Sequence, residues 1–256
     1  MPTTGLNRFA GTIPSWLGEL RDEFILNFIK DGRWKWLLQG LGNTLRITAI
    51  ALLLGLAIGV VVASVRASYD KNREMMALRG GIGYCVLGFF NAICKVYLAI
   101  IRGTPVVVQL LIMYFIIFAS SRNEVMVAVL AFGINSGAYV AEIIRGGIMA
   151  VDNGQFEAGR SLGFNYVQTM VYIIIPQVIK SVLPALLNEF IALLKETSVA
   201  GYVGIMDLTK AGDLIRGRTF SAFMPLIAVA LIYLVIVLVL TGLVGRLERR
   251  LRKSER

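Results

Sequence analysis

Long apolar blocks separated by short polar segments run through this chain. A helix needs about 20 apolar residues to cross a bilayer core of about 30 Å, because its backbone groups must bond within the segment. The pattern predicts an all-α integral membrane protein with about five transmembrane helices, at 45–65, 96–119, 125–144, 178–194 and 220–244. The apolar run 82–94 is too short to span alone, so it either lies at the inner surface or extends the second span.

Basic residues flank these blocks and predict how the chain is oriented. Segment 66–95 and the tail are rich in Lys and Arg, whereas the short loop 120–124 contains only Arg122. The positive-inside rule therefore places 66–95, the loop after the third span and the C-terminus in the cytoplasm, and the N-terminus outside. The net charge of +10 then reflects membrane edges and contact with anionic lipid, and predicts no nucleic-acid partner.

This orientation predicts three regions along the chain. Segment 1–41 is extracytoplasmic or interfacial, and within it 24–41 mixes apolar residues with charges and tryptophans, as a helix lying on the membrane does. Residues 42–245 form the transmembrane domain, with a polar loop at about 152–176. Residues 246–256 form a basic cytoplasmic tail.

The composition argues against a membrane enzyme. The chain has no histidine, its two cysteines lack metal-site spacing, and the spans hold no paired aspartates. We expect no metal site, no catalytic residue and no cofactor held by this chain. It also lacks the G-x-x-x-x-G-K-[ST] sequence that binds nucleotide phosphates.

The polar loop carries a recognisable motif. Glu157-Ala158-Gly159, then three residues, Gly163, nine residues and Ile173-x-Ile175-Pro176 resemble the EAA motif of ATP-binding-cassette (ABC) importer permeases. Gly159 replaces an alanine and Ile175 a leucine. Three further stretches resemble the polar amino acid permeases of that family: Arg102-Gly103-Thr104-Pro105 with Gln109, the run 135–147, and the run 188–198.

The resemblance implies the MetI-like fold of type I importer permeases, with the EAA segment as a cytoplasmic coupling helix. Small residues suit close contact with another protein, Gly163 can end a helix with positive φ, and Pro176 would break the next one. We place Glu157 in the first helical turn, near the positive end of the helix dipole. The residues expected to couple are Gln155, Glu157, Ala158, Gly159, Ser161, Leu162 and Gly163.

Polar residues inside the predicted spans are candidates for a solute path, because such groups are costly in lipid. Asn135, Tyr139 and Glu142 share one helical face, and Pro105 should break its helix. A structural alternative is open: Arg102 and Glu142 pair or meet headgroups, and Asn135 bridges helices. Gly146 and Gly147 are expected in a turn. The path candidates are Arg102, Thr104, Pro105, Gln109, Asn135, Ser136, Tyr139, Glu142, Asn188 and Glu189.

Partners and cargo follow from the resemblance. It implies a dimer of cytoplasmic ABC ATPase subunits that bind ATP and Mg²⁺, a second permease copy or paralogue, and an extracytoplasmic solute-binding protein, all at a bacterial cytoplasmic membrane. The expected cargo is a polar amino acid, with an osmolyte, an opine or a sulfur compound as the alternative. A basic amino acid would use Glu142 or Glu189, whereas an amide or acidic one would use the amides and Arg102.

Overall fold

The computed structural model describes residues 15–79 and 81–253, and these form helices joined by short turns, with no β-strand among them. Five helical segments are long and apolar enough to cross a membrane. The long helices are α2 (Trp34–Arg79), α3 (Ile82–Gly103), α5 (Glu124–Ala150), α8 (Ile175–Glu196) and α10 (Phe223–Lys253). Shorter helices are α1 (Ser15–Phe24), α4 (Val106–Ile112), α6 (Asn153–Ser161), α7 (Tyr166–Thr169) and α9 (Leu208–Thr219). The π turns are Ile25–Ile29, Met113–Ile117 and Met170–Ile174, and the 3₁₀ turns are Lys30–Gly32 and Thr197–Val203.

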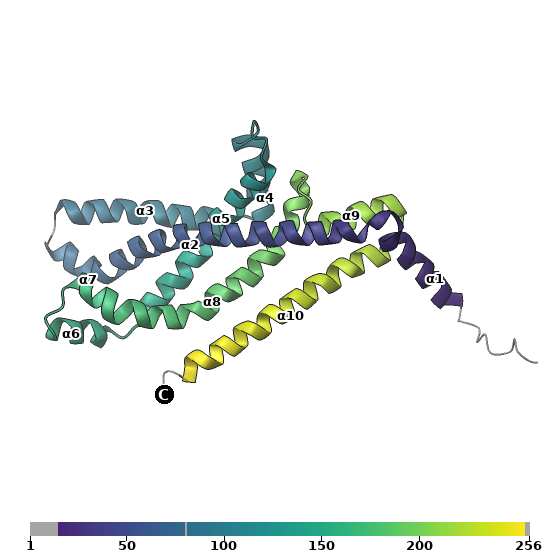
Figure 1. The fold of residues 1–256 in the computed structure, drawn as a ribbon. Helices are drawn as coiled ribbons and strands as arrows, with labels where there is room; N and C mark the ends of the chain where they lie inside the picture. Colours follow the sequence, from purple (N-terminus) through teal and green to yellow (C-terminus); the bar gives the residue numbers. More distant parts are fainter. Residues whose placement is uncertain (1–14, 80, 254–256) are drawn as a thin grey trace, which may run out of the picture.

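The helices form an elongated bundle whose two ends differ. Figure 1 shows α6 and α7 at one end, with α1 and α9 at the other. The α10 helix packs against α8 and α9 near its start and then diverges from the bundle as it returns to the α6 end. Short connections therefore fix most neighbours, and the α5–α6–α7 turn lies far from the α9 segment.

The centre of the bundle is the crossing of α2 and α5, the most extensive helix pair in the chain. Each helix carries two glycines four residues apart, Gly55 and Gly59 on α2, and Gly133 and Gly137 on α5. A Cβ atom at Gly59 would overlap the side chain of Val140, and one at Gly133 would lie 2.6 Å from Leu54 Cδ2. Glycine pairs with this spacing allow two membrane helices to approach closely.

The second span differs from the predicted one. We predicted it at 96–119, but the spanning helix is Ile82–Gly103, so the run 82–94 forms the first part of the span. Thr104 and Pro105 have extended backbone, because proline donates no hydrogen bond and disfavours helix in the residue before it. The break expected at Pro105 is confirmed, and a separate apolar segment, Val106–Ile117, follows it.

Other helices also begin or end at residues different from those predicted. The first span begins at Trp34, after a turn in which Asp31 has φ +57°, so Trp34 and Trp36 lie on the span and not on a separate interfacial helix. The turn expected at Gly146 and Gly147 is wrong, because both lie inside α5. A Cβ at Gly147 would overlap Val182, which explains a glycine there by close packing on α8.

We predict that Gly59→Ala destabilises the bundle by about 1–3 kcal/mol, because the added methyl overlaps Val140 and neither helix can move away cheaply. Thermal unfolding of the purified protein in detergent measures this. Gly42→Ala is the matched control, since nothing lies within 4 Å of its new Cβ. Equal melting of Gly59→Ala and wild type would contradict the close crossing.

Candidate functional site

The α6 helix has a built cap at each end. Asp152 accepts a hydrogen bond from the Gly154 backbone N–H at 2.6 Å, which closes the N-terminus. At the other end Gly163 has φ +81°, and the Phe164 N–H bonds to the Gly159 carbonyl at 3.0 Å. This six-to-one bond with a left-handed glycine is the Schellman arrangement. The predicted role of Gly163 as a helix end is confirmed.

Glu157 does not lie where we predicted it. The helix begins at Asn153, so its first turn holds no acidic residue and Glu157 lies past that turn. Asp152 is the carboxylate at the positive end of the helix dipole. Glu157 is instead exposed on the outer face, and sequence reasoning missed Asp152 because it started the helix too late.

Gly159, which stands where the family motif has alanine, is buried against the next helix. A Cβ there would lie 2.6 Å from Thr169 Oγ1 and 2.7 Å from Thr169 Cγ2. Thr169 ends α7, whose start is closed by a capping box in which the Asn165 and Gln168 side chains each bond the other's backbone N–H. The glycine therefore lets α6 pack directly on the segment leading into α8.

The inner face of α6 is tied to three membrane helices. Lys71 on α2 donates to Asn153 Oδ1 at 2.6 Å, and its ammonium lies 4.8 Å from the centre of the Phe156 ring. Gln177 on α8 donates to Gln155 Oε1 at 3.3 Å. Beneath these contacts, α2, α5 and α8 share an apolar cluster formed by Ala67, Ile148, Ile174, Val178 and Val182, against which Phe156 packs.

The outer face of α6 is exposed and carries the small residues Ala158 and Ser161 beside the charged residues Glu157 and Arg160. Leu162 is the most prominent apolar side chain there, with 71% of its surface exposed. Of the residues expected to couple, Glu157, Ala158, Ser161, Leu162 and Gly163 are exposed, Gln155 is half-buried, and Gly159 is buried. The predicted set thus divides into an outer surface and two positions that anchor the helix.

Pro176 does not break a helix. The segment from Tyr166 to Val203 is continuous enough to count as one span, and Pro176 lies in the first turn of α8. The π turn Met170–Ile174 directly precedes it. The π turn changes the backbone hydrogen bonding directly before the proline, which has no N–H to donate, and the helical segment continues past it.

A second group of predicted residues surrounds the break between α3 and α4. The Gln109 side-chain amide donates to the Ile101 carbonyl at 2.7 Å and to Thr104 Oγ1 at 2.8 Å. Its oxygen accepts from Asn135 Nδ2 on α5 at 2.9 Å. Gln109 therefore satisfies backbone groups freed at Pro105 and links the break to α5.

The break adjoins a buried polar pair on α5. Asn135 is 2% exposed and its Oδ1 atom has no hydrogen-bond partner, while Ser136 is fully buried and donates to Glu189 Oε1 on α8 at 2.8 Å. Two adjacent residues of α5 thus make separate contacts, Asn135 with Gln109 on α4 and Ser136 with Glu189 on α8. Asn188, beside Glu189, is exposed.

The remaining predicted residues belong to a ladder of charges. Glu142 lies 3.9 Å from Arg102 and 2.9 Å from Arg145, and Arg102 also stacks on the Tyr139 ring at 5.6 Å. Arg145 continues to Asp70 on α2 at 3.3 Å. The ladder ends where Arg66 bonds Asn91 on α3 at 2.7 Å. The structural alternative holds for Arg102 and Glu142, which pair with each other.

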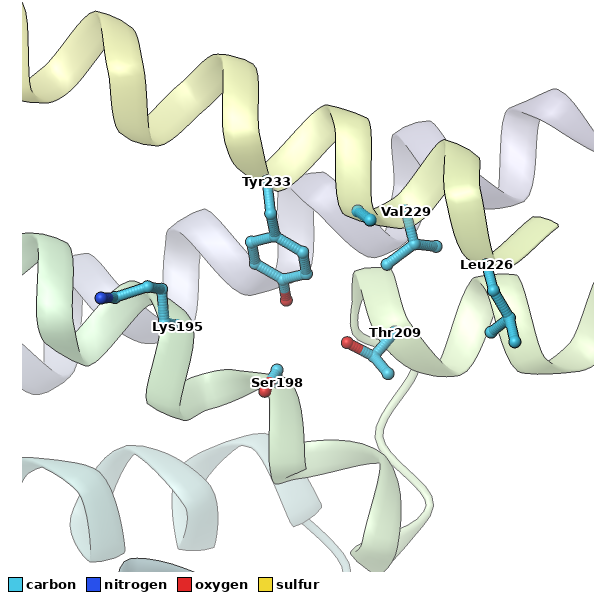
Figure 2. Close-up of a pocket in the computed structure, with 7 residues that line it drawn as sticks. Lys195, Ser198, Thr209, Leu226, Val229 and Tyr233 are labelled. Atoms are coloured by element: carbon cyan, nitrogen blue, oxygen red, sulfur yellow. The ribbon is translucent and has the colours of Figure 1, made fainter. Parts of the chain in front are cut away.

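A cavity of about 330 Å³ lies between α8, α9 and α10. Figure 2 shows the Tyr233 hydroxyl directed from α10 toward Ser198 and Thr209. Sequence reasoning missed Thr209 and Tyr233, which lie outside the motifs. Within the described residues, no three His, Cys, Asp or Glu side chains meet as a metal site would require. The lining is Lys195, Ser198, Thr209, Leu226, Val229, Ala230 and Tyr233.

The start of α9, on the floor of this cavity, is fixed by a buried carboxylate. Asp207 is fully buried and accepts from the Thr209 and Lys210 N–H groups at 3.1 and 3.0 Å. Burial raises the pKa of the Asp207 carboxyl, and these N–H bonds oppose the shift. Thr44 on α2 accepts from the Leu208 N–H at 3.1 Å, so α9 is held on the first span.

Comparison with known proteins identifies the class. Residues 82–253 match the family described as "Binding-protein-dependent transport system inner membrane component". The chain belongs to this family of ABC importer permeases. Such a permease is a membrane component and is not itself a catalyst. The resemblance predicted from the motifs is therefore confirmed.

Individual relatives cover most of both chains. The arginine transport system permease protein ArtQ of Bacillus subtilis is 34% identical over 222 residues, covering 86% of this chain and 94% of the relative. The glutamine transport system permease protein GlnP of Escherichia coli K12 is 35% identical over 221 residues, covering 84% and 93%.

Solved structures confirm the fold. A crystal structure of an amino acid ABC transporter with histidines is 38% identical, with a TM-score of 0.74 over 87% of this chain and 98% of that one. The MetNI methionine ABC transporter, at 17% identity, has a TM-score of 0.70 over 85% and 97%. The predicted MetI-like, all-helical fold is the fold of this chain.

We predict that Gly163→Val destabilises the end of α6 while Gly163→Asn is tolerated. No atom lies within 4 Å of a Cβ at this position, so the cost comes from its φ of +81°, which asparagine accepts better than a β-branched residue. Protease cleavage near 162–165 in membrane vesicles should increase for Gly163→Val. Equal cleavage of the two variants would contradict a backbone origin.

Proposed function

We propose that the chain is the transmembrane subunit of an importer for polar amino acids, in which α6 transmits movement of an ATPase to the membrane helices. One observation carries this proposal. The α6 helix is capped at both ends and exposes small residues outward, while its inner face is joined to α2, α5 and α8. An element built in this way moves as a unit with the spans when another protein presses on it.

The partners proposed are those that the importer class requires. A dimer of cytoplasmic ATPase subunits binds ATP and Mg²⁺ and docks on the outer face of α6. A second permease copy or paralogue completes the membrane unit, and an extracytoplasmic binding protein delivers the solute. The α6 end and the C-terminus then face the cytoplasm, and α1 and α9 face outward, which is supported by the basic tail and by the short loop 120–124 with its single Arg122.

The proposed solute path uses the polar groups that α4, α5 and α8 bring together. The broken backbone at Pro105 is exposed in the single chain, and Gln109, which bonds to the Ile101 carbonyl at the break, links it to Asn135 on α5. Ser136, the next residue on α5, contacts Glu189. The cavity between α8, α9 and α10 lies toward the proposed outer end. Alternating access would expose these polar groups to each side in turn.

An amino acid cargo is supported by the named relatives. The two curated relatives carry arginine and glutamine transport in their names, and the 38% identical structure is an amino acid transporter. Uptake of a radiolabelled panel into proteoliposomes holding the full complex tests this proposal. Uptake of an osmolyte, an opine or a sulfur compound, with no amino acid transported, would replace it.

We predict that Leu162→Asp abolishes ATP-driven uptake without unfolding the chain. Leu162 is largely exposed, so no intrachain packing is lost, whereas a charge at the docking surface disfavours an apolar contact. The measurements are uptake, pull-down of the ATPase and the melting temperature. Leu162→Met is the matched control and should retain uptake. Normal uptake by Leu162→Asp would overturn the docking role.

A further inference from the structure

The first part of α2 is attached to the segment that begins α9. Asn43 Nδ2 donates to the Met206 carbonyl at 2.9 Å, and the Leu208 N–H donates to Thr44 Oγ1 at 3.1 Å. Leu37 belongs to the apolar cluster that also contains Leu208. Hydrogen bonds and apolar packing therefore hold the start of α9 on this end of α2.

Near its other end, α2 contacts α6 through Lys71. The Lys71 ammonium donates to Asn153 Oδ1 and lies over the Phe156 ring, and both of these partners are on α6. Asn153 and Phe156 are three residues apart, so they share a face of that helix and one ammonium can hold both. Ala67, one turn earlier on α2, belongs to the apolar cluster against which Phe156 packs. Lys71 thus fixes how α6 is placed against α2.

The helix between these two attachments is continuous. No proline and no break interrupts α2. At a rise of about 1.5 Å per residue, it places Lys71 about 42 Å from Asn43. The close packing of Gly59 on α5 and the ion pair of Asp70 with Arg145 support its middle and its inner half. A displacement of α6 is therefore carried along α2 to the start of α9, because the supported helix resists bending.

We infer that α2 connects α6 mechanically to the outer segment at α9, and that Lys71 is the positioning residue that holds α6 on this connection. This inference rests on the proposed function and adds a route by which movement of the ATPase reaches the outer end of the permease. The α2 helix precedes residues 82–253, which match the family, so the route does not follow from membership of the family. Lys71 acts through α6, whose placement it sets.

The test measures uptake and ATP hydrolysis together in proteoliposomes that hold the full complex, with the solute that the wild-type complex takes up fastest from the radiolabelled panel. The bond from Lys71 to Asn153 is exposed and contributes little to the free energy of unfolding, so Lys71→Met should melt as wild type does. Its uptake per ATP hydrolysed should fall about threefold or more. Lys71→Arg keeps a cation and N–H donors, so it should retain most of the wild-type ratio.

A second pair of variants tests the route along α2. Asn43→Leu removes the bond to the Met206 carbonyl and should lower uptake per ATP as Lys71→Met does. Two breaks in one route reduce coupling no further than one break, so the double variant should equal the more impaired single variant. The matched control is Gln177→Leu, which removes a contact of α6 with α8 and leaves the contacts with α2. Its effect should add to that of Asn43→Leu.

The outcomes separate this inference from the importer proposal. A wild-type ratio of uptake to hydrolysis in Lys71→Met, an equal loss in Lys71→Arg, or additive losses in the double variant of Lys71 and Asn43 would each overturn the inference and leave the importer proposal standing. If Asn43→Leu does not fold, the two Lys71 variants decide alone. A wild-type complex that hydrolyses ATP and takes up no solute of the panel would remove the importer proposal and the inference with it.

Discussion

The close approach of α2 and α5 is the constraint on which the rest of the structure depends. Side chains larger than hydrogen at Gly59 and Gly133 would separate these helices. Lipid tails are as apolar as leucine, so packing and polar contacts, and not escape from water, hold membrane helices together. The charge ladder and the contacts of Asn135 and Ser136 lie on these two helices or join them to helices packed against them. A wider crossing would move Arg145 on α5 away from Asp70 on α2.

Two kinds of polar group serve different purposes in the bundle. The ladder from Arg102 to Asn91 joins α2, α3 and α5, and its charged groups pair with one another. This agrees with a structural role for charges in lipid. The cluster at Asn135 and Glu189 is open, because it holds an acceptor and a carboxylate without a cation. Ionisable groups within spans are candidates for functional sites, and the proposed solute path therefore uses this cluster.

The sequence predicted the fold class and the family, and it failed at the boundaries of the helices. Apolar length predicts that a span exists, but not where it ends. The second span was therefore placed at 96–119, although the spanning helix is Ile82–Gly103 and ends before the break at Pro105. Glu157 was expected in the first helical turn because the helix was taken to start at the EAA motif, whereas the N-cap residue Asp152 precedes that motif. Pairing was not predictable either. Whether Arg102 pairs with Glu142 or contacts a solute depends on how three helices cross. The periodicity of residues along one helix does not predict that crossing.

The π turn at Met170–Ile174 has a consequence for the middle of the membrane. A π turn holds one residue more than an α turn, and one residue corresponds to about 100° of rotation around a helix axis. The π turn next to Thr169, where α6 packs, therefore determines how α8 is rotated about its own axis. If that turn became regular α-helix, the carboxyl of Glu189 would rotate off Ser136 without any change at its own level. A local change in winding at the proposed ATPase end is thus also a change in which side chain faces the interior.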